Sequence, residues 1–280
     1  MVSGFTADIV GRVRNRFTHI TFRPPRRSRF AQMNTRVFTP VVSPEYGAHV
    51  VVATSFGVGV AVANTWNMGT AFALLSLVGV YIGHYPLLLM LRARRITARW
   101  TLWSAIYGAV ALAGIIPLVT SLPLMQRLII VAVPIFAASM LLGMGRHYRS
   151  LTHELIVFAG LSLAAPWALI PTRQFFSPDA IGLWFVVMLA FWSAVFAVRV
   201  RSRGLPARLT MTLYLVCASL AAWGLVASGL IPAEYLWILA APALRMIAVF
   251  VAPEWWTDLP ITWTGIVESS VAVGMVVAAV

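Results

Sequence analysis

Long apolar runs separated by short arginine-bearing stretches recur along this 280-residue chain, and they constrain its fold more than any other feature. Each run is about 18 to 25 residues long, the length that a helix needs to cross a hydrocarbon core roughly 30 Å thick. The chain is 60% hydrophobic and only 10% charged, whereas a soluble domain carries about 25% charged residues. We therefore expect an all-α fold, a polytopic membrane bundle.

The runs predict about nine transmembrane helices, joined by short connections that carry proline or asparagine. The predicted spans are 47–63, 68–91, 100–119, 125–144, 151–170, 179–199, 207–230, 235–252 and 262–280. We expect residues 43–280 to form one transmembrane helical domain with no separate soluble domain.

The arginines predict the orientation of the bundle. The chain has 21 arginines and no lysine. Most of the arginines after the N-terminal segment lie in alternate loops, at 92–99, 146–149 and 199–208. The intervening loops hold almost none, with Arg173 beside Asp179 as the exception. Because basic loops stay in the cytoplasm, we expect a cytoplasmic N-terminus and, for an odd number of spans, an external C-terminus.

Residues 1–42 form a basic arm that holds eight arginines but no apolar core of a signal peptide. We expect this arm to be cytoplasmic and disordered. The net charge of +13 could indicate nucleic-acid binding, but its placement in the arm and in short loops indicates anionic lipid head groups instead. We expect the lipid bilayer as partner, no nucleic acid, and a multi-pass location in the cell (inner or plasma) membrane. The single cysteine, Cys217, excludes a disulfide framework.

A few charged or titratable side chains lie inside the apolar runs, where they are costly and tend to be functional. All of them fall in the half of the bundle that we expect to face the cytoplasm. With two neighbours, Tyr85 and Arg199, they form a candidate binding site, which we call the polar cluster. Its members are Glu45, His49, His84, Tyr85, Glu154, Arg199, Arg245 and Glu268.

Arg245 and Glu268 are the best-matched pair in the polar cluster. Arg245 comes about seven residues before the inner end of the eighth span and Glu268 about six after the ninth begins, so both lie roughly 10 Å deep. Two antiparallel helices would bring them together as an ion pair, in which each charge offsets the desolvation of the other. The pair either locks the two helices together or leaves Arg245 to contact a ligand, and the sequence leaves both open.

Other chemistry has little support in the sequence. No tight motif links the histidines and glutamates of the polar cluster, so we expect no bound metal and no cofactor. A glycine-rich phosphate loop and a Ser-His-Asp arrangement are both missing, and His84 is either a packing residue or an acid–base group. The glycines within the spans are expected to be close-packing residues. Examples are Gly57, Gly59, Gly79 and Gly108.

Several short motifs, taken in order, resemble those of the YwiC-like membrane proteins. They are Ser43 to His49, His84 to Leu88, Trp100 to Ala109, Arg149 to Leu155, Phe196 to Arg199, Leu244-Arg245 and Gly265 to Glu268. Their order and spacing carry the likeness over about residues 40–280. In the first motif Tyr46 stands where the family has histidine, and His49 stands where it has tryptophan. The resemblance implies an integral membrane protein whose activity is uncharacterised.

A fainter likeness runs to the UbiA-type prenyltransferases, which also have nine helices and a cytoplasmic polar site. Those enzymes hold magnesium and a prenyl diphosphate with aspartate-rich motifs. Here Asp8, Asp179 and Asp258 are isolated, so we expect no standard magnesium-dependent prenyl transfer.

Three function classes remain open, and the sequence favours the first. The first is an assembly or scaffold role in the membrane. The second is binding or transport of an anionic or amphipathic small molecule through a cytoplasm-facing polar cavity. The third is an enzyme on a lipid or isoprenoid substrate, with His84, Glu154 and Glu45 as acid–base groups. No catalytic motif and no clear internal repeat of the transporter kind decides among them.

Overall fold

A computed structural model describes residues 37–43, 46–144, 150–173, 178–203 and 206–280. The chain divides into two compact units, residues 1–40 and 41–280, and every helix described below belongs to the second. The part of the chain that the structure describes contains helices and no strand, so the expected all-α fold is confirmed. The expected disorder of the basic arm falls mostly on residues 1–36, which lie outside these ranges.

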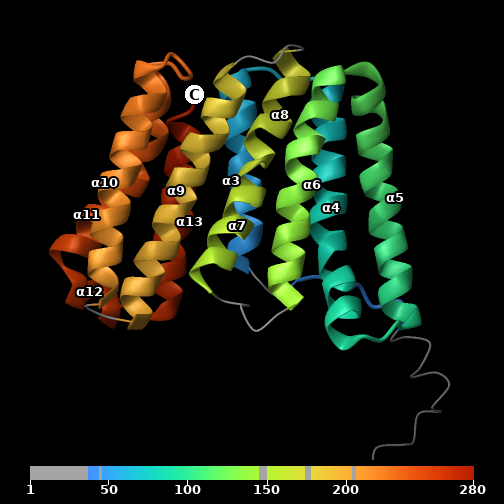
Figure 1. Cartoon of the computed structure of the whole chain (residues 1–280), viewed down its shortest axis with the longest axis horizontal. Helices are drawn as coiled ribbons and strands as arrows, with labels where there is room; N and C mark the ends of the chain where they lie inside the picture. Colours follow the sequence, from blue (N-terminus) through green and yellow to red (C-terminus); the bar gives the residue numbers. More distant parts are fainter. Residues whose placement is uncertain (1–36, 44–45, 145–149, 174–177, 204–205) are drawn as a thin grey trace, which may run out of the picture. The chain divides into compact units, whose positions relative to one another are not determined.

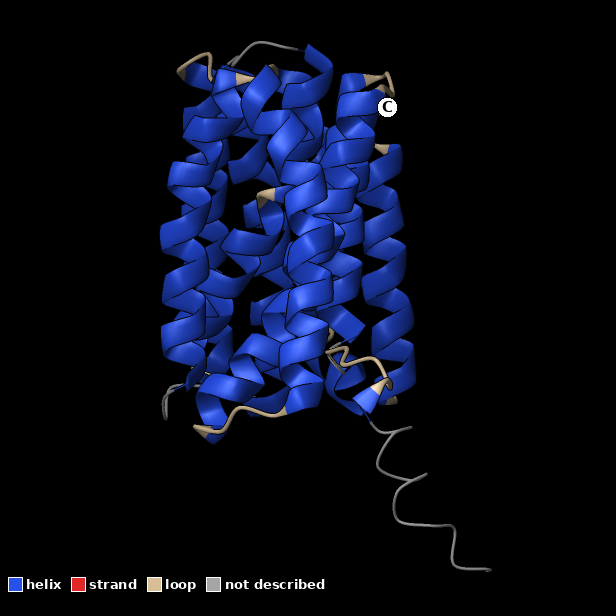
Figure 2. Ribbon diagram, turned by 90° about the vertical axis from the view of Figure 1, so that its right-hand side faces the viewer, coloured by secondary structure: helices blue, strands red, loops and turns tan. Residues whose placement is uncertain are grey.

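Seven helices are long and apolar enough to cross a membrane, which confirms a polytopic bundle. They are α4 (Met68–Ala93), α5 (Ala98–Ser121), α6 (Pro123–Met144), α7 (Leu151–Ser162) continued by α8 (Ala164–Arg173), α9 (Pro178–Arg203), α10 (Pro206–Ala227), and η1 (Ala233–Leu239) continued by α11 (Ala240–Val251). Two further apolar helices are shorter, α3 (Tyr46–Ala63) and α13 (Ile261–Val277). Successive spans run in alternate directions between the same two ends of this unit (Figures 1 and 2). The count of nine crossings and the orientation in a membrane stay predictions.

Two of the predicted spans are not continuous α-helices. The fifth breaks between α7 and α8 because Pro166 has no N–H to donate to the carbonyl of Ser162. The amide of Leu163 there bonds to the carbonyl of Gly160 at 3.2 Å. The eighth span opens as the 3-10 helix η1, and a short helix, α12 (Pro253–Asp258), lies where the sequence predicts only a loop.

Local sequence explains where several helices begin and end. Asn67 caps α4 through a capping box with Thr70, and the Thr97 side chain accepts a hydrogen bond from a backbone amide in the first turn of α5. After α3 and α4 the chain adopts a left-handed backbone at Asn64 (φ 51°) and Arg94 (φ 46°). Such a residue commonly ends a helix by turning the chain away from its axis.

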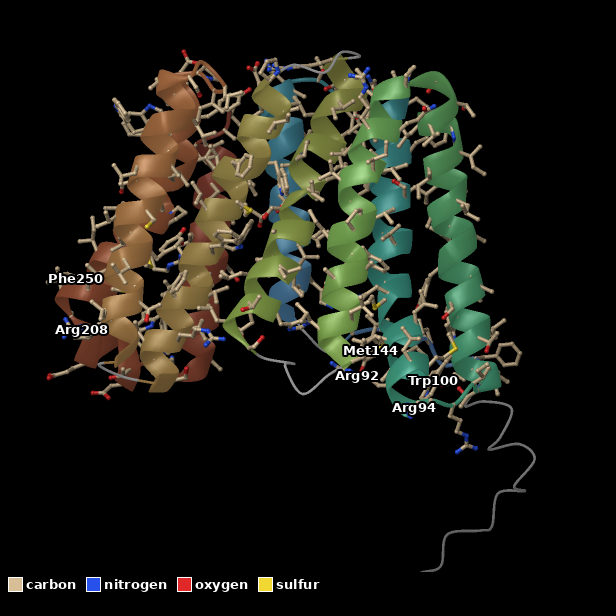
Figure 3. All side chains as sticks on the ribbon, in the orientation of Figure 1. Arg92, Arg94, Trp100, Met144, Arg208 and Phe250 are labelled. Atoms are coloured by element: carbon tan, nitrogen blue, oxygen red, sulfur yellow. The ribbon has the colours of Figure 1, made fainter. Side chains whose placement is uncertain are left out.

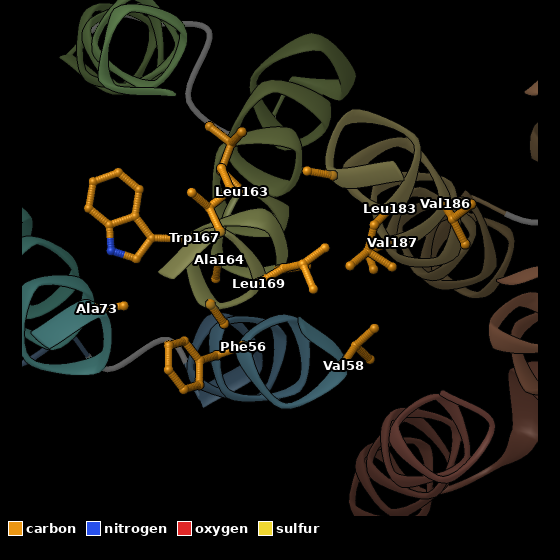
Figure 4. Close-up of a cluster of buried hydrophobic side chains, with 14 of the residues drawn as sticks. Phe56, Val58, Ala73, Leu163, Ala164, Trp167, Leu169, Leu183, Val186 and Val187 are labelled. Carbon is orange, nitrogen blue, oxygen red and sulfur yellow. The ribbon is translucent and has the colours of Figure 1, made fainter. Parts of the chain in front are cut away.

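The short helix α8 forms the centre of the larger hydrophobic core. All residues from Ala164 to Pro171 are buried, as expected for a helix that is apolar all round. Neighbouring side chains from α3, α4 and α9 surround it (Figure 4). The polar atom of Trp167 is also satisfied, because its indole N–H donates to Ser76 Oγ at 2.8 Å.

Glycines allow the closest helix contacts. A Cβ atom at Gly59 of α3 would lie 3.0 Å from the Cβ of Ala168, and one at Gly79 of α4 would lie 2.7 Å from the Cα of Ala111 on α5. A Cβ atom at Gly57 would lie 3.3 Å from Cγ2 of Val276, so the close-packing prediction is confirmed at these three positions. It is wrong for Gly108, where no atom of a neighbouring segment lies within 4 Å of the position of a Cβ.

The described arginines near helix ends gather mostly at one end of the larger unit. Figure 3 labels Arg92, Arg94 and Arg208 at this end, together with Met144, the last residue of α6. This arrangement agrees with the predicted alternation of basic loops, whose segment 145–149 lies outside the described residues. The opposite end carries Arg173 and also Arg127, near the start of α6, which is a second exception to the predicted pattern.

Arginines at the basic end bind carbonyl oxygens of neighbouring helices. Arg92 Nε donates to the carbonyl of Gly143 at 2.8 Å, in the last turn of α6. Arg208 Nη2 donates to the carbonyl of Phe250 at 2.9 Å, in the last turn of α11, with its guanidinium 5.7 Å from the centre of the Phe250 ring. The last carbonyls of a helix lack partners within that helix, and positive charge is favoured there. These arginines therefore stabilise the bundle itself.

Candidate functional site

The structure divides the described members of the polar cluster among three places. One lies between α9, α11 and α13, one between α7 and α9, and one between α3, α4 and α6. Glu45 lies outside the described residues. The polar cluster is therefore not a single site within the part of the chain that is described.

Arg245 and Glu268 form the most buried of these places. Arg245 lies on α11 with only 3% of its side chain exposed, and its Nη1 donates to Oε2 of Glu268 on α13. Its Nη2 donates to the hydroxyl of Ser193 on α9. The predicted contact between Arg245 and Glu268 is confirmed, and the third helix is an addition that the sequence did not indicate.

The pattern of α11 explains why this guanidinium points inward. Pro242, Arg245, Met246 and Val249 are its buried residues, at the spacing of three or four that defines one helix face. Met246 and Val249 pack into an apolar cluster with Trp256 of α12. Arg245 belongs to the same face, so the packing of Met246 and Val249 also places its guanidinium inside the bundle.

Most polar atoms around Arg245 have partners. Ser193 Oγ donates to the carbonyl of Ala190 at 2.5 Å, and the Tyr214 hydroxyl of α10 donates to the carbonyl of Leu189. Two buried atoms have no hydrogen-bond partner among the described residues, Nε of Arg245 and Oε1 of Glu268. Such atoms are rare in folded proteins and often mark a ligand or water position. The site therefore offers one donor and one acceptor.

Glu154 and Arg199 form a second ion pair, which the sequence did not predict. Arg199 Nε and Nη2 donate to Glu154 Oε2 at 3.0 and 2.8 Å. The exposed fraction is 11% for the Arg199 side chain and 33% for the Glu154 side chain, so this pair is more exposed than the first. Both residues were candidates, and their similar depth on two antiparallel spans was the signal that could have paired them.

The same face of α9 holds α7 along most of its length. Trp192 donates to the carbonyl of Leu155 at 2.8 Å, and Trp184 donates to the carbonyl of Ala159 at 2.9 Å. Trp184, Trp192 and Arg199 follow each other at intervals of eight and seven residues, which places them on one side of the helix. The Glu154–Arg199 pair thus completes a helix-packing seam.

His49 and His84, the two histidines of the polar cluster, each contact the ring of Tyr81. The His49 ring lies edge-on to the Tyr81 ring at 5.2 Å, and the His84 ring stacks against Tyr81 at 6.4 Å. His84 Nδ1 lies 3.1 Å from the carbonyl of Tyr81, and since a carbonyl only accepts, Nδ1 carries the proton. Phe136 of α6 lies edge-on to His84 at 6.4 Å. This arrangement packs three helices together.

Three further observations concern Tyr85, metal ligands and the charged pair at the opposite end of the bundle. Tyr85 is half-buried and makes no hydrogen bond or ring contact within the described residues. Among these residues no group of three or more His, Cys, Asp or Glu side chains is placed to hold a metal ion. At the opposite end, Arg173 Nη1 binds Asp179 Oδ2 at 3.2 Å, and their expected proximity is confirmed.

Comparison with known proteins adds one match. No curated protein and no solved structure matches the chain. One family model matches, and its match ends at residue 169. The later motifs, which include Arg199, Arg245 and Glu268, lie beyond that match, so for them the likeness stays a resemblance. The family model of the YwiC-like protein matches residues 42–169, so over that part, from the approach to α3 into α8, the resemblance seen in the motifs is confirmed.

Proposed function

We propose that this integral membrane protein is a scaffold of the cell membrane, on which other membrane components assemble. The supporting observation is that charged side chains within its spans bind neighbouring helices. Arg245 links α11 to α13 and α9, and Arg199 links α9 to α7. A charge kept for substrate would need its counter-charge from the ligand, whereas these charges already have one within the bundle.

The proposed orientation places the basic end in the cytoplasm. Arg94 and Arg95, in the turn between α4 and α5, are exposed, so they can meet anionic head groups of the inner leaflet. Trp255 of α12 and Trp263 of α13 are also exposed near this end. Tryptophan is enriched at the boundary between lipid and water, so α12 is proposed to lie at that boundary.

The test is a native gel of gently solubilised membranes, probed for a tagged copy of the chain. A scaffold is expected in an assembly that contains other membrane proteins, and Arg245→Met/Glu268→Leu should keep that assembly because it preserves volume and packing. Gly59→Leu should lose the assembly, since its side chain would separate α3 from α8. Migration of the wild-type chain alone, at every detergent-to-lipid ratio, would exclude the scaffold role.

A second candidate is the binding of an amphipathic small molecule. The buried donor and acceptor without partners, at Arg245 and Glu268, favour it. The enzyme interpretation has weaker support, because Glu154 binds Arg199 while His84 packs against Tyr81 and Phe136, in a different place. The described residues therefore bring no acid–base pair together.

A further inference from the structure

We infer that copies of this chain associate side by side in the membrane, with α12 of one copy against the α4–α5 turn of the next. The two surfaces are called the acidic face and the basic turn. The acidic face consists of Glu254, Trp255 and Asp258, and the basic turn consists of Arg94, Arg95 and Ile96. Such self-association goes beyond the scaffold role, which a single copy could fill.

The packing of α12 turns the acidic face outward. Trp256 is buried, and its indole N–H donates to the carbonyl of Ala197 on α9 at 2.9 Å. Glu254 and Asp258 are exposed and four residues apart, so they lie on one side of the helix. Trp255, next to Glu254, is 52% exposed. Neither carboxylate belongs to an ion pair among the described residues.

The basic turn complements the acidic face in charge and resembles it in layout. Arg94 ends α4 with a left-handed backbone and Thr97 caps α5, which leaves the residues between the two helices exposed. Ile96 is 81% exposed beside two arginines, as Trp255 is exposed beside two carboxylates. An apolar side chain with polar groups around it is the usual layout of a protein interface, and tryptophan and arginine contribute most to binding there.

The two surfaces lie too far apart to meet within one copy. Both are at the basic end of the larger unit, with α12 on one side and the α4–α5 turn on the other (Figures 1 and 3). Figure 3 labels Arg94 on one side and Phe250, three residues before the start of α12, on the other. Copies inserted in one orientation present both surfaces at the same depth. Lateral association therefore brings the acidic face of one copy to the basic turn of its neighbour.

The membrane surface favours a cationic partner for the acidic face. In the proposed orientation both surfaces lie at the cytoplasmic leaflet, whose anionic lipids attract arginine and repel carboxylates. Glu254 and Asp258 therefore gain more from a neighbour's arginines than from the surrounding lipid. Arg94 and Arg95 meet head groups in a lone copy, and the neighbour's carboxylates replace those head groups when copies associate.

The contact joins two different surfaces, so each copy still has one surface free after it binds a neighbour. Contacts of this kind form a ring when the rotation between copies closes, and a row when it does not. We therefore expect assemblies larger than a dimer.

Cross-linking of two differently tagged copies in lipid membranes tests the contact. In a Cys217→Ala background, one copy carries Ala98→Cys beside the basic turn and the other carries Ala252→Cys beside the acidic face. Both alanines are exposed and lie outside the two surfaces. A short bismaleimide should join these two copies but should not join two copies of Ala98→Cys. A chain with both cysteines should give a ladder of products beyond the dimer.

The yield of the cross-link should depend on salt. Raising the salt concentration from about 0.1 M to about 1 M shortens the Debye length from about 10 Å to about 3 Å, which weakens attraction between exposed charges. An unchanged yield would contradict the role of the charges and overturn the inference.

Charge reversal identifies the partner of each surface. Glu254→Arg/Asp258→Arg in every copy, or Arg94→Glu/Arg95→Glu in every copy, should lower the yield about tenfold, because like charges then face each other. A mixture of the two variants should restore the yield, since each acidic surface again meets a basic one. Recovery on mixing also shows that both variants fold. As a matched control, Glu234→Arg reverses an exposed carboxylate at the opposite end and should leave the yield unchanged.

The outcomes separate self-association from other roles of the two surfaces. Absence of the cross-link, equal cross-linking of like copies, or no recovery on mixing would each overturn the inference. Loss in Arg94→Glu/Arg95→Glu with full yield in Glu254→Arg/Asp258→Arg would overturn it too, and would assign the basic turn to lipid head groups. A ladder that contains only this chain would support self-association, while the native gel decides the scaffold role separately.

Discussion

Removing the carboxylate of Glu268 should destabilise the protein more than removing the carboxylate of Glu154, although each is half of an ion pair between helices. The two pairs differ in burial. The Arg245 side chain is 3% exposed, whereas Arg199 is 11% and Glu154 33% exposed. The arginine that remains in Glu268→Ala is thus sealed from water, and the one that remains in Glu154→Ala is not.

The expected magnitudes follow from this difference. A buried charge that loses its partner costs about 3–5 kcal/mol of unfolding free energy. Among the hydrogen-bond partners of Arg245 in the described part of the chain, the Ser193 hydroxyl would then be the one that remains, and it carries no charge. For Glu154→Ala we expect about 1–2 kcal/mol, between the value of an exposed ion pair and that of a buried charged hydrogen bond.

The double variant Arg245→Met/Glu268→Leu distinguishes two contributions to the loss of stability: the loss of the attraction between the two charges, and the cost of a buried charge without a partner. Replacing both partners with apolar side chains of similar volume removes the desolvation cost together with the attraction. We therefore expect it to recover most of the loss and to lie within about 1 kcal/mol of wild type. Arg245→Ala alone should stay as unstable as Glu268→Ala, because it leaves a buried carboxylate.

Reversible unfolding in mixed detergent micelles, followed by tryptophan fluorescence, measures these free energies. Equal losses for Glu268→Ala and Glu154→Ala would contradict the argument from burial. A double variant as unstable as the single variants would show that the pair contributes through shape and not through charge.

Three other predictions follow. Gly79→Ala should lose about 1–3 kcal/mol because its Cβ meets the α5 backbone, whereas Gly108→Ala should gain up to about 1 kcal/mol from helix propensity, measured by the same unfolding assay. In a Cys217→Ala background, Arg95→Cys and Ser228→Cys should react with a membrane-impermeant thiol reagent from opposite sides; labelling from one side would refute the alternation of spans. Geranylgeranyl diphosphate should leave the thermal midpoint unchanged with or without magnesium, and a magnesium-dependent rise would restore the enzyme interpretation.

The positions of the spans were predictable because length and apolarity decide them. Residues 68–91 were expected to form a span, and α4 covers Met68–Ala93. Residues 179–199 were expected, and α9 covers Pro178–Arg203. A helix in lipid must satisfy its own backbone, so an apolar run of sufficient length leaves few alternatives. The charge of the loops predicts which side of the membrane each loop faces, but it does not predict which helices pack against each other.

The break between α7 and α8 was not predictable from proline alone. Pro86, Pro117 and Pro134 lie inside α4, α5 and α6, which continue through them. Pro171 is a further case, because α8 continues through it although it lies in the fully buried segment Ala164–Pro171. A proline therefore permits a break in a helix without requiring one.

Pairing of side chains was only partly predictable, for a related reason. Arg245 and Glu268 lie on consecutive spans, so equal depth was enough to bring them together. Ser193 lies 52 residues from Arg245, and nothing in the sequence indicates that α9 packs beside α11. Gly108 illustrates the same limit, because a glycine suited to close packing faces open space in the structure.

The family match covers only part of the bundle, and this affects what the match implies. Within residues 42–169, Gly59 and Gly79 make close helix contacts and the start of α8 is buried. Beyond them, Arg245 and Glu268 join helices that the match does not cover. A variant at Gly59 therefore tests packing in the YwiC-like part. A variant at Arg245 tests a property of the remaining helices, which has to be established on this chain because no matched relative carries it.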